Sequence, residues 1–129
     1  MAAPPPTVLV VDDVAWVRNV LSASLPRYGF TVLPAENGQQ ALDLCRRTDA
    51  VRVAVIDKGL PDMDGLELLA ALRQLNPEIH CALMSGDAPL AAEELPGLGW
   101  VHVFRKPFSL VEVAQGLWQL LGEEGPPVV

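Results

Sequence analysis

Five short apolar segments recur along the chain at similar intervals. They are rich in β-branched and aliphatic residues, which is typical of strands buried on both faces of a sheet. The predicted strands cover residues 7–11, 31–35, 53–56, 80–84 and 101–104. Pro34 lies inside the second strand and has no N–H to donate to a neighbour, so we expect this strand at an edge of the sheet.

The stretches between the strands carry apolar residues three or four positions apart, the spacing of an amphipathic helix. The predicted apolar stripes are Val14, Val17, Leu21 and Leu25; Ala41, Leu42 and Cys45; Leu66, Leu69, Leu72 and Leu75; and Val113, Leu117, Leu120 and Leu121. Ser109 and Glu112 form a capping-box pair at the start of the last helix, and Gly122 can end that helix. These patterns predict a helix after each of the first three strands and after the last strand.

The stretch between the fourth and fifth strands has weaker helical signals. Pro89 can occupy the first turn of a helix, but Pro96, Gly97 and Gly99 interrupt any helix soon afterwards. We therefore expect the fourth helix, in this stretch, to be short or mobile.

Strict alternation of buried strands and helices is typical of a parallel sheet that is covered by helices on both faces and joined by right-handed crossovers. The predicted fold class is α/β, a doubly wound, flavodoxin-like (βα)5 domain with a parallel five-stranded sheet. The strand order 2-1-3-4-5 places the proline-containing second strand at an edge. With 129 residues, we expect a single domain spanning 1–129, with a core of about 7–122 and tails at 1–6 and 123–129.

The charge balance and the apolar runs exclude several classes of partner. The net charge of −7, from 9 basic and 16 acidic residues, offers no basic field for direct nucleic-acid binding. No apolar run approaches the roughly 20 residues of a membrane span. Residues 1–6 lack the basic and apolar regions of a secretory signal, so we expect a cytoplasmic protein without membrane contact.

Cysteine and histidine residues do not suggest a site. Cys45 and Cys81 are isolated and have no CxxC spacing, so neither a disulfide framework nor a zinc site is expected. His80 and His102 lie at the openings of two predicted strands, where an imidazole without a catalytic role is the usual case.

Acidic residues follow the two central strands of the predicted sheet. Asp12 and Asp13 come directly after the first strand, and Asp57 follows the third. Ligands of open parallel sheets collect at the carboxyl ends of the strands, where the strand order reverses, so the fold itself brings these three carboxylates together. Crowded carboxylates repel one another unless a hard divalent cation neutralises them, and Mg²⁺ with oxygen ligands is the natural choice.

Two further residues supply the remaining groups for phosphoryl chemistry. Ser85 follows the fourth strand with a hydroxyl, and Lys106 follows the fifth strand with an ammonium that can meet an anionic oxygen. A carboxylate can attack phosphorus and form an aspartyl phosphate while cation, hydroxyl and ammonium share the charge of the phosphoryl oxygens. We expect Asp57 to be that nucleophile.

The segments VLVVDD, VAVIDKGLPDMDG, LMSG and FRKPF occur here in the order and at the spacings of bacterial response-regulator receiver domains. The resemblance, which includes chemotaxis regulators, covers nearly the whole chain. It implies that Asp12, Asp13, Asp57 and the carbonyl of Gly59 hold Mg²⁺ and that Asp57 accepts the phosphoryl group. It also implies that Ser85 and Lys106 bind the phosphoryl oxygens and that the Lys106–Pro107 peptide is cis.

The same resemblance implies the biological role. The chain would be a phosphoacceptor in a two-component phosphorelay, fed by a histidine kinase or a histidine phosphotransfer domain. It would be a signalling regulator rather than an enzyme, although it would catalyse its own phosphorylation and dephosphorylation. The downstream partner would bind the face made by the fourth helix, the fifth strand and the fifth helix.

Two features depart from the family pattern or stay outside the predicted site. The family often has Tyr or Phe three residues before the lysine, whereas this chain has Val103 there and Phe104 one place later. We therefore expect the aromatic relay of the family to be altered, and the signal to leave by a changed face. Asp62 and Asp64 are interpreted as turn and cap residues near the start of the third helix.

The same residues are open to other interpretations than a receiver domain. Asp12 and Asp13 could simply cap the first helix, but capping would not require partners at the ends of three other strands. A magnesium-dependent phosphohydrolase would carry a DxD pair, and Asp57 is instead followed by Lys58 and Gly59. A flavin-binding module would need a phosphate-cradling loop where the acidic pair stands. A degenerate receiver that acts only as a docking module remains the alternative.

Overall fold

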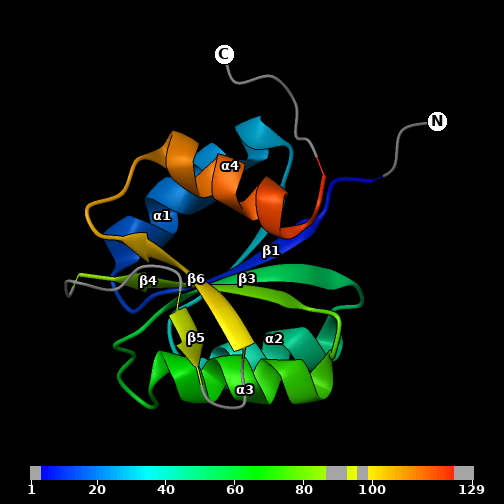
Figure 1. Cartoon of the computed structure of the whole chain (residues 1–129), viewed down its shortest axis with the longest axis vertical. Helices are drawn as coiled ribbons and strands as arrows, with labels where there is room; N and C mark the ends of the chain where they lie inside the picture. The colour runs from blue at the N-terminus through cyan, green and yellow to red at the C-terminus, as the bar shows by residue number, and fades with distance from the viewer. Residues whose placement is uncertain (1–3, 87–92, 96–98, 124–129) are drawn as a thin grey trace.

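The computed structural model describes residues 4–86, 93–95 and 99–123 and has three layers, with one sheet between two pairs of helices (Figure 1). On one face lie α1 (Ala15–Ser24) and α4 (Leu110–Leu120), and on the other lie α2 (Gly38–Arg47) and α3 (Gly65–Leu75). A short 3₁₀ helix, η1 (Leu25–Tyr28), extends α1. Helices on both faces of the sheet confirm the predicted doubly wound α/β class.

Five strands of the sheet run parallel in the predicted order. They are β1 (Thr7–Val11), β2 (Thr31–Ala35), β3 (Val51–Asp57), β4 (His80–Ser85) and β6 (Gly99–Arg105). The complete order is β2-β1-β3-β4-β6-β5, in which β6 is the predicted fifth strand. Pro34 lies on β2 at an edge of the sheet, as predicted from its missing N–H.

A sixth strand was not predicted between the fourth and fifth predicted strands, whereas the predicted short fourth helix, which Pro89 would begin, falls mainly on residues outside the described chain. Within that stretch, β5 (Glu93–Leu95) pairs antiparallel with β6, while residues 87–92 and 96–98 lie outside the described chain. Without β5, one side of β6 would leave its backbone N–H and C=O groups without strand partners.

The strands divide their side chains between two apolar cores. Val8, Val10, Val53 and Val55 point toward α1 and α4, whereas their neighbours along each strand point toward α2 and α3. Alternation along a strand sends successive side chains to opposite faces, and both faces are buried here. The strands therefore consist almost wholly of apolar residues, which is the pattern that identified them in the sequence.

The helix ends follow cap signals, with two refinements. Ser109 Oγ accepts a hydrogen bond from the N–H of Glu112, and Gly122 ends the last helix with a φ of 68°. Asp64 caps α3 through the N–H of Leu66, but Asp62 reaches the start of α2 instead. Two members of the predicted apolar stripes, Val14 and Leu75, stand at helix ends and are 45% and 43% exposed.

Across the described residues, no helix is both long enough and apolar enough to span a bilayer. This finding agrees with the short apolar runs of the sequence.

Candidate functional site

Three carboxylates meet at the carboxyl edge of the parallel sheet. Asp12 and Asp13 follow β1, Asp57 is the last residue of β3, and these two strands are neighbours. One oxygen from each carboxylate lies within 4.8 Å of the others. The fold thus gathers the three acidic residues that the sequence placed at this edge.

Lys106 joins this acidic cluster from the end of β6. Its Nζ lies 2.8 Å from Asp12 Oδ2 and 3.2 Å from Asp57 Oδ1, so one ammonium bridges the two carboxylates. The backbone N–H of Lys106 donates to the carbonyl of Ser85, which ties the end of β6 to the end of β4. The peptide between Lys106 and Pro107 is cis, as the family resemblance implied.

Asp12 is fully buried and is held through four of its polar atoms. Its N–H donates to the carbonyl of Ala35, and its Oδ1 accepts from the N–H of Val14 at 2.9 Å. Its Oδ2 accepts from Lys106, and its carbonyl accepts from Arg18. Buried polar groups are costly unless each finds a partner, so this set of bonds fixes Asp12 in one position.

Arg18 is a contributor that the sequence interpretation did not identify. It lies on α1, and its guanidinium donates to the Asp12 carbonyl at 2.8 Å and lies 3.7 Å from the carboxylate of Glu36. The Asp12 carbonyl belongs to the peptide that carries Asp13, so Arg18 helps to orient the second member of the acidic pair. Its position on the first helix, six residues after Asp12, is the signal that could have indicated this role.

Burial and neighbouring charges shift the protonation of two groups at the site. Removal from water raises the pKa of Asp57, Asp12 raises it further, and Lys106 offsets part of the change. Burial alone would lower the pKa of Lys106, but the hydrogen bond and charge of Asp12, followed by those of Asp57, raise it above its ordinary value. Lys106 is therefore a stable cation beside a carboxylate that is costly to keep charged.

A hollow of about 340 Å³ opens beside Asp57. It is lined by Asp57, Lys58, Gly59, Asp64, Ser85 and Gly86. The hollow therefore brings together three of the predicted site residues, Asp57, Gly59 and Ser85, and Ser85 itself is buried. Lys58 and Asp64 were not predicted there. Their place follows from the turn after β3, in which Gly59 and Asp64 form an isolated antiparallel β-bridge.

The donor set of the acidic cluster fits a hard divalent cation. All three grouped side chains offer carboxylate oxygens, and the cluster contains neither the sulfur nor the imidazole ligands that favour zinc. Among the described residues, the acidic, histidine and cysteine side chains that lie close enough together to hold a metal ion are these three aspartates. The chemistry of these side chains thus agrees with the ion that the sequence suggested.

The aromatic residue near the site occupies a different environment from the one at which the family usually has its ring. Phe104 is 5% exposed and packs in the core between the sheet, α1 and α4, whereas Val103 packs against the opposite core. The one-residue displacement sends the ring to the other face of the sheet because side chains alternate along β6. The altered aromatic relay stays a prediction.

The remaining cysteine and histidine residues stay outside the site. Cys45 and Cys81 are both free, and burial raises the pKa of Cys81 to about 12, so its thiol is protonated and unreactive. His102 contacts the ring of Phe104 in an edge arrangement with ring centroids 4.6 Å apart. These contacts fit the structural roles expected from the sequence.

Comparisons with known proteins identify the family. The model of the response regulator receiver domain matches residues 8–117. The chain is 40% identical over 120 residues to the chemotaxis protein CheY homolog of Campylobacter jejuni, covering 88% of this chain and 91% of that protein. Among solved structures, the signal receiver domain of an HD domain-containing protein from Pseudomonas fluorescens has a TM-score of 0.80 and 28% identity, covering 95% of this chain and 90% of that chain.

A further relative is longer than this chain. The response regulator MprA of Mycobacterium sp. (strain KMS) is 35% identical over 126 residues, which are 95% of this chain and 53% of MprA. The chain thus spans about half the length of this curated relative.

Proposed function

Because the chain belongs to the response regulator receiver domains of two-component signalling systems, we propose that Asp57 is its phosphoacceptor and that Mg²⁺ binds beside it. Asp12, Asp13, Asp57 and the backbone carbonyl of Gly59 would hold the ion. Ser85 and Lys106 would bind the phosphoryl oxygens. The protein would then act as a switch whose partner binding depends on phosphorylation.

The observation that carries this proposal is the grouping of three carboxylates and one ammonium at the end of the central strands. Oxygens of Asp12, Asp13 and Asp57 lie within 4.8 Å of one another, and Lys106 Nζ lies 3.2 Å from Asp57. Such a concentration of negative charge has a cost in an empty site, and that cost is offset when a cation binds. The adjoining hollow offers space for the phosphoryl group.

The chemistry proposed for the site is a direct transfer. A carboxylate oxygen of Asp57 attacks phosphorus, the bond from phosphorus to the donor's imidazole nitrogen breaks, and the imidazole leaves with the bonding electrons. The carboxylates of Asp12, Asp13 and Asp57 would hold Mg²⁺, whose positive charge would lower the repulsion between Asp57 and the phosphoryl oxygens. The ammonium of Lys106 and the hydroxyl of Ser85 stabilise the charge on those oxygens. Hydrolysis of the aspartyl phosphate by water would reset the switch.

Intact mass spectrometry tests the proposal directly. The wild-type chain is incubated with acetyl phosphate in the presence and absence of Mg²⁺, beside Asp57→Asn. We expect one phosphoryl adduct on the wild type that requires Mg²⁺ and is absent from the variant. Asp49→Asn is the matched control, because Asp49 is exposed and lies just before β3, at the end of this strand opposite to Asp57.

Other results would lead to different functions. An adduct that persists in Asp57→Asn would show that another residue is phosphorylated. Absence of an adduct from the wild type in saturating Mg²⁺ would contradict the phosphoacceptor role and leave a docking module as the function to pursue. Steady release of phosphate without a trapped adduct would instead indicate a phosphohydrolase.

The partners follow from the same chemistry. We propose that a histidine kinase or a histidine phosphotransfer domain supplies the phosphoryl group in the cytoplasm. Exposed apolar side chains beside the site, Val14 at 45% and Trp16 at 70%, would support its docking next to Asp13. The downstream partner would bind the face made by the predicted fourth helix, which falls mainly outside the described residues, together with β6 and α4.

A further inference from the structure

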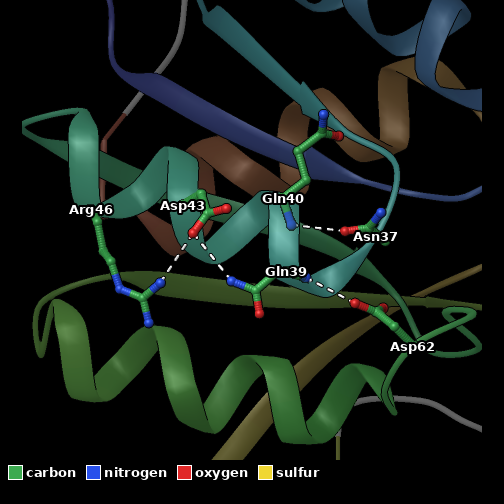
Figure 2. A network of polar contacts seen from close by, with 6 residues as sticks. All are labelled: Asn37, Gln39, Gln40, Asp43, Arg46 and Asp62. Carbon is green, nitrogen blue, oxygen red and sulfur yellow. Dashed lines mark hydrogen bonds and ion pairs between the residues drawn. The ribbon is translucent and has the colours of Figure 1, made fainter.

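Asp62 joins two elements that are distant in the sequence. It lies in the segment 58–64, which connects β3 to α3, and its carboxylate accepts hydrogen bonds from the start of α2 (Figure 2). Oδ1 accepts from the N–H of Gly38 at 2.9 Å, and Oδ2 accepts from the N–H of Gln39 at 3.0 Å. The first N–H groups of a helix lack partners within the helix, and a carboxylate is the favourable acceptor there.

The helix α2 already has a cap from the residue that directly precedes it. Asn37 Oδ1 accepts from the N–H of Gln40 at 2.8 Å, which is the usual N-cap bond (Figure 2). Asp62 takes the two preceding N–H groups, so three successive N–H groups of α2 are satisfied by two side chains. The bonds of Asp62 thus add something that ordinary capping does not, a connection between α2 and the segment 58–64.

Close packing strengthens the same connection. A Cβ placed on Gly38 would lie 2.4 Å from Sδ of Met63, far inside van der Waals contact. The absence of a side chain at Gly38 leaves room for the end of the Met63 side chain, which packs directly against the start of α2. The neighbouring Asp62 is therefore presented to the helix at short range, and two successive residues of the segment contact α2.

The same segment forms one wall of the proposed phosphorylation site. Its first residues, Lys58 and Gly59, line the hollow beside Asp57. The N–H of Lys58 donates to the carbonyl of Met84, and the N–H of Gly65 donates to the carbonyl of Lys58. Both ends of the segment are thus fixed by backbone bonds to the sheet and to α3, and Asp62 fixes its exposed middle to α2.

We propose that Asp62 is a positioning residue for the phosphorylation site, because it holds the segment 58–64 so that the carbonyl of Gly59 can join the Mg²⁺ ligands. This inference rests on the proposed function, since it assumes that Gly59 is a ligand. Asp62 itself touches neither the ion nor the phosphoryl group. It acts by restricting the conformations of the segment before Mg²⁺ binds.

The consequence is a change in Mg²⁺ affinity rather than in the reaction itself. Without the hydrogen bonds of Asp62, the segment 58–64 occupies more conformations. Mg²⁺ then binds only the fraction of molecules in the competent conformation, and the apparent affinity falls by that fraction. We expect Asp62→Ala to raise the Kd for Mg²⁺ about threefold to tenfold, less than the effect of removing a direct partner of a ligand. At saturating Mg²⁺, the rate of adduct formation should approach that of the wild type.

Asn37→Ala is a matched control. It removes the other side chain that caps α2 at the same end, but it makes no bond to the segment 58–64 that the structure records. Both variants should weaken the start of α2 and lower the urea midpoint, whereas Asp62→Ala alone should weaken Mg²⁺ binding. Asp62→Asn keeps one acceptor oxygen and should give an intermediate Kd, and it serves as the test if Asp62→Ala does not fold.

The experiment is isothermal titration calorimetry of the whole chain with MgCl₂, followed by adduct formation across a Mg²⁺ series. A higher Kd for the Asp62 variants, with an unchanged Kd for Asn37→Ala, supports the inference. Equal shifts in all variants, or no shift in any, overturn it and leave Asp62 as a helix cap. If the wild type itself binds no Mg²⁺, the proposed function fails as well, so the two failures are distinguishable.

Discussion

The ring of Phe104 occupies space that Gly116 leaves open on α4. A Cβ on Gly116 would lie 2.6 Å from Cε1 and 2.7 Å from Cζ of that ring. Gly116 is buried in the middle of a helix, where glycine is otherwise unfavourable, so its presence reflects the close approach of the aromatic side chain. The displaced ring of β6 and the glycine of α4 therefore form one packed unit.

Gly116→Ala should lower the free energy of unfolding. The added methyl group forces the buried ring of Phe104 to move, and overpacking of this kind outweighs the gain in helix propensity by about 1–2 kcal/mol. Urea unfolding followed by circular dichroism measures the change. Gln115→Ala, at the exposed neighbouring position, should change stability by less than about 0.5 kcal/mol. Equal or greater stability of Gly116→Ala would mean that the ring adapts freely.

Asp57→Asn should stabilise the fold at neutral pH while it removes the phosphoacceptor. Burial first, and then the charge of Asp12, raise the pKa of Asp57 above 3.8. Between 3.8 and the raised pKa, the native state holds more protons than the unfolded state, so stability falls as the pH increases through this window. Asparagine carries no charge and avoids this loss.

Urea titrations of both proteins at neutral pH, and at a pH below 3.8, provide the measurement. The variant should be the more stable protein at neutral pH, and the difference should shrink in acid, where Asp57 is protonated in both states. Asp49→Asn controls for the change in net charge at an exposed position. A variant less stable than the wild type at neutral pH would indicate that the ion pair with Lys106 outweighs the cost of burial.

His102 should make the free energy of unfolding depend on pH with the sign opposite to that of Asp57. Burial lowers its pKa below 6.5, so the unfolded state binds a proton more readily than the native state. Stability is therefore constant above pH 6.5, falls as the pH drops from 6.5 to the lowered pKa, and levels off below it. His102→Gln does not titrate and should lack this contribution.

The check is a set of urea midpoints for the wild type and His102→Gln between about pH 5 and 8. The difference between the two proteins should change in favour of the variant as the solution becomes acidic. Parallel curves over the whole range would show that His102 is accessible to water in the native state.

Arg18→Ala should cost more stability than removal of a surface arginine. The side chain of Arg18 is 18% exposed and donates to the carbonyl of the buried Asp12, so its loss leaves an acceptor without this charged partner, at about 1–2 kcal/mol. Arg46→Ala is the control, because its ion pair with Asp43 is half exposed and should contribute less than about 0.5 kcal/mol. Similar losses in both variants would contradict a specific role for Arg18.

The strands and the site residues could be predicted from the chain because their signals are local. A strand buried on both faces must be apolar at every position, and Pro34 marks an edge because it lacks a donor. Parallel strands end at one edge of the sheet, so the positions of Asp12, Asp57 and Lys106 in the sequence already bring them together.

The tertiary structure alone decided the features that depend on partners distant in the sequence. Residues Glu93–Leu95 form a strand because the edge of β6 offers partners for their backbone groups. The local sequence cannot predict this strand, because the pairing depends on where β6 lies in the sheet. Asp62 accepts a hydrogen bond from the start of α2 rather than from α3, and Arg18 donates to the carbonyl of Asp12. Both bonds can form only once the elements have packed. Periodicity and turn residues determine which elements form, whereas hydrogen bonds between elements depend on their final arrangement in space.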